Sequence, residues 1–455
     1  MDAAEPRTTS LPEAGGRLGY IFRTLRHREF RLFLAGQFVS LIGMWMQNMA
    51  QSWLVYRLTG SSLLLGATGF AGQLPVLFLA PLGGAVADRF ERRRIVLAAQ
   101  VAMMLLAFAL AALTLGGWVQ IWQVILLATL QGVAAAFDVP ARQSLFAELV
   151  GREDLMNAIA LNSSMFNSAR VVGPAIAGLI VARVGEGWCF LLNGLSYLAV
   201  ISALLAIRSK RVDVVKEPAP ASAVIIEGFR FAWQTRPVRA LLLLVGAVSL
   251  LGSSYSVLMP VFAGSVLGGG ARGLGLLMGA SGAGALAGAL TVAGRRGVKG
   301  LGRWVAASCA GFGVAVAFFA QSRSYWLSAT LVFAAGCALM LQMASSKTLI
   351  QVMTPDVLRG RVMALYSMML LGMAPLGSLA AGVLAQSLGA PTAVTLGGIA
   401  AVAGAVVFHR RWRDLRAEAR ELLLAQTAVA GEPAAPTVPV AFHKPGDSAP
   451  RRGRD

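Results

Sequence analysis

A dense cluster of charged side chains lies between two long apolar runs in the first half of the chain. Within seven residues it holds one aspartate and four arginines, namely Asp88, Arg89, Arg92, Arg93 and Arg94. A carboxylate beside guanidinium groups forms charge-assisted ion pairs, and at a helix end it can also cap the N-terminus of a facing helix. These residue types therefore indicate ion pairing between helix ends.

The apolar runs on either side of this cluster, 63–86 and 95–115, are each long enough to cross a bilayer as a helix. We therefore predict that the cluster is a short loop between two hairpinned membrane helices, with Gly83 and Gly84 letting the first helix end in close packing. Positive charge on a short loop indicates the cytoplasmic side of the membrane.

A second candidate site is an arginine inside an apolar run. Four residues recur every three or four positions and so share one helix face, namely Ser163, Asn167, Arg170 and Pro174. Arg170 falls near the middle of the predicted span, where a charge is costly unless it faces water or a partner. We expect it to line a cavity and to meet an anionic or polar group of a substrate. The alternative is a structural ion pair or hydrogen bonds to backbone carbonyls.

Five amide side chains inside apolar runs are further candidates for a substrate cavity, namely Gln47, Gln51, Gln73, Gln131 and Gln342. Gln47 and Gln51 are one turn apart and should point the same way. Amides that face a wet cavity would bind a ligand, whereas amides bonded to neighbouring helices would stabilise packing. Both alternatives stay open for each of the five.

The composition is that of an integral membrane protein. The 455 residues are 56% hydrophobic and 13% charged, with a mean hydropathy of +0.67. A soluble domain needs a more polar surface than this composition can supply. Because lipid offers the backbone no partner, and because the apolar runs are continuous rather than alternating, the spans are predicted to be helices.

The net charge of +19 does not indicate nucleic-acid binding, because the basic residues cluster in short loops. We attribute them to membrane topology and to contacts with anionic lipid at the cytoplasmic face. The three cysteines and three histidines lack the spacing of a metal site or a disulfide framework. We find no nucleotide-binding loop and no catalytic constellation, so the sequence predicts neither an enzyme nor direct use of ATP.

Twelve spans are predicted, six on each side of a polar linker. Their approximate ranges are 30–56, 63–87, 95–115, 119–139, 157–183, 188–207, 238–266, 273–294, 301–321, 325–349, 361–387 and 391–409. The predicted division is an N-terminus (1–29), a first six-helix bundle (30–207), a linker (208–237), a second bundle (238–411) and a tail (412–455). Lysine and arginine crowd the termini and the linker, so we place these on the cytoplasmic side.

The linker is expected to include an amphipathic interfacial helix, with a plain linker as the alternative. The tail is expected to be largely disordered. The two halves resemble each other weakly, since a Gly173-Pro174 step inside span five is matched by an Ala374-Pro375 step inside span eleven. Each step allows a bend. Internal duplication of this kind is a transporter architecture, with the substrate site at the midplane between the halves.

The loop after span two resembles the signature loop of the major facilitator superfamily, which reads Gly, three residues, Asp, Arg or Lys, one residue, Gly, Arg, Arg or Lys. The matching residues are Gly84, Asp88, Arg89, Arg92 and Arg93. Glu91 replaces the second glycine. Within the superfamily the chain most resembles the branch of enterobactin exporters and macrolide efflux proteins. Segments 28–33, 88–93, 137–143 and 155–158, ahead of Gly173-Pro174, carry this likeness, which extends over about residues 20–410.

The resemblance implies a lock at the cytoplasmic end. Asp138 would pair with an arginine of the signature loop, such as Arg92, and Asp88 would face the start of span eleven near Arg361. Together these contacts would hold one of two access states. The rival interpretation makes Asp138 a proton carrier.

The resemblance also implies efflux of a drug or siderophore by alternating access, driven by the proton gradient without a bound cofactor. The Gly-Pro step of span five favours export over import. We expect a monomeric, multi-pass protein of the bacterial inner membrane. The alternatives are an uptake transporter for a metabolite and a non-transporting receptor on the same fold.

Overall fold

The computed structural model describes residues 24, 26–207, 221–295, 297 and 300–429, and over these ranges the chain forms helices and no strand. The first half contains α2 (Arg28–Thr59), α3 (Ser62–Arg89), α4 (Arg92–Leu115), α5 (Ile121–Val184) and α6 (Glu186–Ala206). The second half contains α7 (Ala221–Gln234), α8 (Arg236–Val257), α9 (Met259–Val261), a π-helical segment (Phe262–Val266), α10 (Gly270–Ala293), α11 (Leu301–Gln321), α12 (Tyr325–Met353), α13 (Asp356–Leu388) and α14 (Ala390–Val429).

Eleven helical segments within the described ranges are long and apolar enough to cross a membrane. The predicted first span corresponds to α2, which has 32 residues but is not among the eleven. Its polar side chains, including Gln37, Gln47, Asn48 and Gln51, lower its mean hydropathy. Membrane crossing by α2, and with it the number of twelve spans, therefore stays a prediction.

Two of the predicted spans lie in a single element, α5, which has 64 residues. The helical path is interrupted at Gly151, whose φ of 75° and ψ of 172° are accessible to glycine and strained for other residues. On either side of this break, Ile121–Gly151 and Asn157–Val184 each have the length and hydropathy of a span. The connection between the fourth and fifth spans is thus helical almost throughout.

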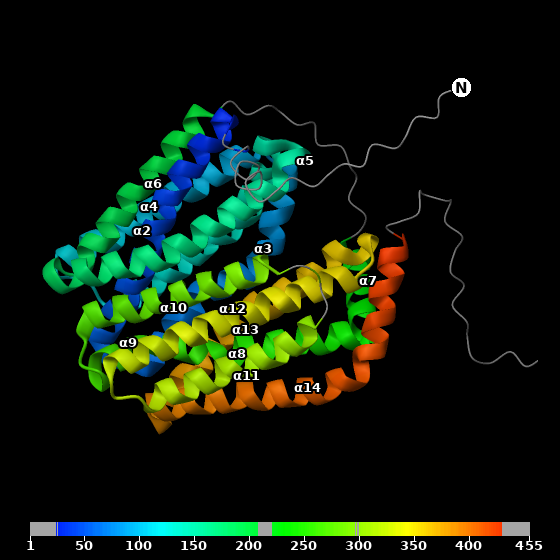
Figure 1. Cartoon of the computed structure of the whole chain (residues 1–455). Coiled ribbons are helices and arrows are strands. Elements are labelled where there is room, and N and C mark those ends of the chain that lie inside the picture. Colours follow the sequence, from blue (N-terminus) through cyan, green and yellow to red (C-terminus); the bar gives the residue numbers. More distant parts are fainter. Residues whose placement is uncertain (1–23, 25, 208–220, 296, 298–299, 430–455) are drawn as a thin grey trace, which may run out of the picture.

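The helices form two bundles that converge at one end and diverge at the other (Figure 1). We call the end where α2 begins, α3 ends and α13 begins the basic end, and the opposite end, where α3 begins and α13 ends, the far end. At the far end, glycines bring α3 against α13 and α5 against α10. Gly66 faces Gly382, and Gly178 faces Gly275.

Towards the basic end, α3 leaves α13 and packs against its own half, with Gly83 on the backbone of Ala136. The helices of the two halves separate in the same direction, as Figure 1 shows to the right of α12. The structure is therefore a state in which the halves meet at the far end and part at the basic end.

The linker helix α7 lies at the basic end beside the start of α13. Gly228 packs on the side chain of Arg361, and the half-exposed rings of Phe229 and Trp233 stack with their centroids 5.7 Å apart. Exposed aromatic rings on a short helix at a bundle end are typical of a helix that lies in the membrane interface. The rest of the predicted linker, residues 208–220, lies outside the described residues.

The last helix differs from the predicted tail. α14 continues through residues 412–429 as helix, although this part is polar, because it is rich in the strong helix formers Ala, Leu, Arg and Glu. The expectation of disorder beyond this point falls on residues 430–455, outside the described part of the chain.

The far-end contact gives a stability prediction. A methyl group at Gly382 would lie 2.8 Å from the carbonyl oxygen of Ser62 and 3.1 Å from Cα of Gly66, both of which are backbone atoms. Gly382→Ala should therefore lower the free energy of unfolding by about 1–3 kcal/mol. Gly360→Ala in the same helix is the matched control, because the space around Gly360 is open. It should leave thermal unfolding of the purified protein unchanged or raise its midpoint. An equal loss in both variants would contradict the proposed tight contact.

Candidate functional site

The first half contains a buried network of amides. Gln47 on α2 donates from Nε2 to Oε1 of Gln131 on α5 at 2.8 Å, and its own Oε1 accepts from Nδ2 of Asn193 on α6 at 2.6 Å. Gly43 makes this approach possible, because a side chain there would collide with Asn193 and Ser196. The network joins three helices and uses both polar functions of Gln47. For Gln47 and Gln131 this geometry favours the packing interpretation over ligand contact.

Arg170 lies beside aromatic rings instead of a carboxylate. Its guanidinium carbon is 5.6 Å from the centroid of the Trp45 ring on α2, and Trp45 meets Phe166 edge-on at 5.6 Å. A cation over an aromatic face is attracted by the ring quadrupole. Within the ranges that the structure describes, the half-buried Arg170 side chain makes no ion pair and no hydrogen bond. Neither structural alternative for this arginine is therefore observed, and its five N–H donors remain available to a ligand.

Two further polar groups near Arg170 are buried without a partner in the described structure. They are Nε1 of Trp45 and Oδ1 of Asn167. The amide nitrogen of Asn167 is used within its own helix, donating to the Ser163 carbonyl at 2.8 Å. Buried donors and acceptors without partners are costly, and they concentrate where a ligand or water completes them. The face of α5 that the sequence singled out thus carries unused hydrogen-bonding capacity beside α2.

The helix break near Arg170 is tightly packed. Gly173 sits against Trp45 of α2, and Pro174 is buried against Gly275 of α10. Pro375 is likewise buried, inside α13. The predicted bends at these prolines stay predictions, whereas their packing against neighbouring helices is observed.

The remaining predicted cavity amides are scattered. Gln51 is half-buried, and Gln73 is exposed and donates to the Gly69 carbonyl of its own helix at 3.4 Å. Gln342 on α12 is fully buried and donates to Oγ of Ser346 at 3.4 Å, while its Oε1 has no partner in the described structure. None of the three contacts Arg170 through a hydrogen bond within the described ranges, so their role in a cavity stays a prediction.

Sequence reasoning missed Lys347. It is the one lysine among the described residues, and it lies on α12 about two turns before the helix ends at Met353. Its side chain is exposed and has no anionic partner in the described part of the chain. The signal was available, since Lys347 falls within the predicted span 325–349 but only two residues before its end, where a lysine side chain can reach the membrane interface, so the argument applied to mid-span Arg170 does not single it out.

The predicted pairing of Asp138 with Arg92 is not what the structure shows. Buried Asp138 pairs with Arg142 at 3.1 Å and accepts from Nε2 of Gln100 at 3.0 Å. Arg92 instead pairs with Glu148 of α5. The reason is position along α4, because Gln100, which Asp138 faces, is eight residues from Arg92 and hence about 12 Å further along the helix.

The other signature-loop residues divide by exposure. Arg93 caps the end of α6, donating from Nε to the Leu204 carbonyl at 2.7 Å. Gly84 has open space around it, and Arg89 is exposed. Asp88 is exposed and makes no ion pair in the described structure, because the start of α13 has moved away with the second half. The expected neighbour Arg361 pairs with Glu227 of α7 instead.

This arrangement agrees with comparisons to known proteins. The family model described as transmembrane secretion effector, a branch of the major facilitator superfamily, matches residues 21–429. The chain belongs to this family. It is therefore a transporter and not an enzyme, as are the relatives found by sequence comparison.

The staphyloferrin A transporter of Staphylococcus aureus is 27% identical over 399 residues, which cover 86% of this chain and 98% of the relative. The enterobactin exporter EntS of Shigella boydii is 26% identical, covering 75% of this chain and 81% of the relative. The multidrug efflux pump Tap of Mycolicibacterium fortuitum is 31% identical over 46% of this chain and 54% of the relative.

Solved structures with the same fold are more distant. The nucleoside transporter NupG aligns with a TM-score of 0.65 at 13% identity, covering 84% of this chain and 98% of NupG. A bacterial homologue of the human lysosomal transporter Spinster, in an inward-facing and occupied conformation, aligns with a TM-score of 0.63 at 13% identity, covering 89% and 97%. At this identity the comparison shows the fold alone.

The amide network predicts a difference between two neighbouring glutamines. Gln47→Ala leaves buried groups of Gln131 and Asn193 without partners, so it should lower the free energy of unfolding by about 1–3 kcal/mol. Gln51→Ala, one turn away, should change it by less than about 0.5 kcal/mol. Thermal unfolding of the ligand-free protein checks this. If Gln47→Ala unfolded like the unmodified protein and lost only ligand affinity, the packing interpretation would be wrong.

Proposed function

We propose that the chain exports small molecules that carry anionic groups, siderophore-like or drug-like, from the cytoplasm by proton-coupled alternating access. The observation that carries this proposal is Arg170, a half-buried arginine inside a membrane-length helix that has no protein anion beside it in the described structure. A charge in that position is expensive unless function retains it.

The surroundings of Arg170 support a substrate that combines negative charge with flat or aromatic surface. The guanidinium offers donors in a planar fork suited to carboxylates and similar oxyanions, and the rings of Trp45 and Phe166 offer apolar faces beside it. Two of the named relatives are a staphyloferrin A transporter and an enterobactin exporter, and a third is a multidrug efflux pump. These names support a siderophore-like or drug-like substrate for this chain.

Alternating access is supported by the uneven contact between the halves. They meet through glycines at the far end and part at the basic end. The excess of lysine and arginine at the basic end favours the cytoplasmic side for that end. On this assignment the structure is open to the cytoplasm, the side from which an exporter loads its substrate. The bacterial relatives favour the inner membrane.

The ion pairs at the basic end supply a switch for the opposite state. In the open state Arg361 is held by Glu227 and Asp88 stands exposed. Closing the basic end would bring the end of α3 to the start of α13, where Asp88 can take Arg361 from Glu227. Both pairs are partly exposed, so each is weak enough to exchange.

Proton coupling is proposed through Asp138. It is a buried carboxylate that is held in the membrane-embedded half by Arg142 and Gln100 instead of by the loop arginine. Protonation would remove its charge and release Arg142, which gives a protein-borne proton a structural consequence. This favours the proton-carrier interpretation of Asp138 over its role as a loop lock.

The test uses everted membrane vesicles with a respiration-driven pH gradient, a pH-reporting dye and a panel of catecholate and carboxylate siderophores, macrolides and lipophilic cations. An anionic compound should be taken up and should dissipate the gradient. Arg170→Gln should raise the KM for that compound about tenfold or more, because a charged hydrogen bond is lost. Arg183→Gln, an exposed arginine at the far end of the same helix, is the matched control and should transport normally.

Asp138→Asn separates coupling from transport in the same vesicles. It should still bind the compound but no longer pass protons in exchange. Uptake that moves only cations, or anion transport that Arg170→Gln leaves unchanged, would overturn the proposed substrate class. Accumulation in right-side-out vesicles instead of everted ones would replace export with uptake.

A further inference from the structure

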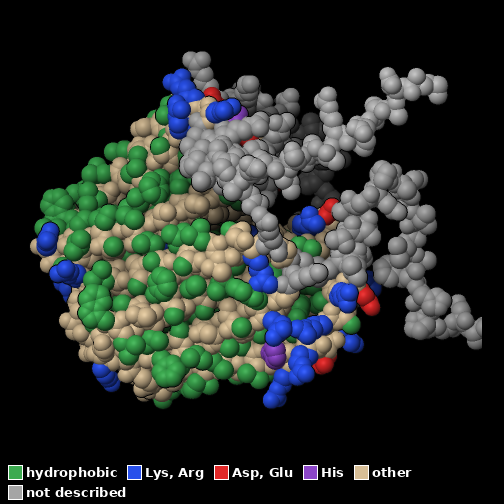
Figure 2. All heavy atoms as spheres, viewed as in Figure 1, with side chains coloured by type: hydrophobic (Ala, Val, Ile, Leu, Met, Phe, Trp, Pro, Cys, Tyr) green, Lys and Arg blue, Asp and Glu red, His purple; other side chains and the backbone are tan. Residues whose placement is uncertain are grey.

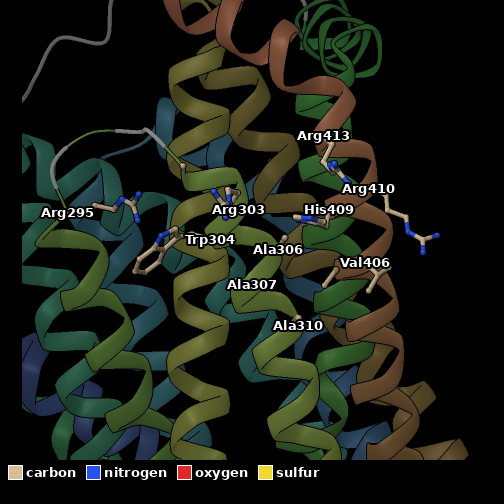
Figure 3. A pocket seen from close by; sticks show the side chains of 12 residues that line it. Arg295, Arg303, Trp304, Ala306, Ala307, Ala310, Val406, His409, Arg410 and Arg413 are labelled. Carbon is tan, nitrogen blue, oxygen red and sulfur yellow. The ribbon is translucent and has the colours of Figure 1, made fainter.

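A basic groove lies on the outer side of the second half, between α11 and α14 at the basic end (Figure 3). Its volume is about 840 Å³. Arginines and a histidine surround its upper part, namely Arg295, Arg303, His409, Arg410 and Arg413, and none of its lining residues is acidic. The groove is therefore positively charged where it meets the membrane surface.

The charged side chains come from both helices. In Figure 3, His409 points from α14 towards Arg303 on α11, whereas Arg410 points away from the groove. The guanidinium of Arg295 lies 4.5 Å from the ring centroid of Trp304, which stands at the edge of the groove. Positive groups that converge from two helices form a site suited to a phosphate group.

Below the charged residues the groove becomes apolar. Its lower walls are small side chains, namely Ala306, Ala307 and Ala310 on α11 and Ala405 and Val406 on α14. Small residues on facing helices leave a furrow that runs from the charged rim towards the middle of the bilayer. A ligand that fills the groove must therefore join an anionic head to a hydrocarbon chain.

The groove is also separate from the transport pathway. The two halves meet through α3, α5, α10 and α13, whereas α11 and α14 pack on each other at the periphery. In Figure 2 the basic and histidine side chains form one edge of an apolar outer surface. An occupant of this groove comes from the surrounding membrane, and we propose that it is an anionic phospholipid bound with its phosphate among Arg303, His409 and Arg413.

The experiment is native mass spectrometry on the delipidated full chain in detergent, titrated with phosphatidylglycerol or with phosphatidylcholine of the same chain length. We expect the first phosphatidylglycerol to bind about tenfold more tightly than phosphatidylcholine. The variant Arg303→Gln/Arg413→Gln should weaken it about tenfold or more, since each basic residue near a membrane surface contributes to anionic lipid binding. Arg28→Gln/Arg31→Gln, which removes two exposed charges elsewhere at the basic end, should leave the affinity within about twofold.

A second variant tests the apolar furrow. Ala307 is exposed, so Ala307→Trp fills the furrow without entering the core, and it should weaken phosphatidylglycerol binding while thermal unfolding stays unchanged. Glycerol phosphate, which has the head but no chains, should not compete at millimolar concentration. Equal binding of the two lipids, equal losses in the two arginine variants, or full competition by glycerol phosphate would each overturn the proposal, the last in favour of a site for a soluble anion.

Discussion

Close backbone contact between the halves at the far end is the constraint on which the other features depend. Glycines let α3 approach α13 and α5 approach α10 to distances that a side chain would prevent. With the halves joined there, the basic end is left open, Asp88 has no partner in the described structure, and Arg361 pairs with Glu227 of the linker helix. Small residues at helix interfaces are the usual means of close approach in lipid, where no hydrophobic force drives helices together.

The same lipid environment separates structural from functional polar groups. The amides of Gln47, Gln131 and Asn193 satisfy one another across three helices. Arg170 does not follow this rule, because it lies over Trp45 with its donors unused in the described structure. A bilayer tolerates such a group when water or a ligand completes it. The outer groove between α11 and α14 has the opposite character, since its charges face the membrane border and its furrow faces hydrocarbon.

The helices were predictable from sequence because hydrophobic length is imposed by the bilayer, and the signature loop and Arg170 stood out against that apolar background. The helical continuity of α5 could not be predicted, because it depends on the conformation of Gly151. The partner of Asp138 was predicted wrongly, since eight residues along α4 separate Arg92 from Gln100, and register between helices is not written in either helix alone. Lys347 was overlooked although the rule that found Arg170 applies to it.

The exchange of Arg361 between Glu227 and Asp88 is the central claim, and a distance measurement tests it most directly. Spin labels at Phe90→Cys and Val357→Cys, in a background without the native cysteines, report the separation of the halves at the basic end in lipid nanodiscs. Glu227→Gln frees Arg361, so the short-distance population should rise about twofold to fivefold, and Asp88→Asn should lower it. Distance distributions that neither variant changes, or that both shift in the same direction, would contradict the account.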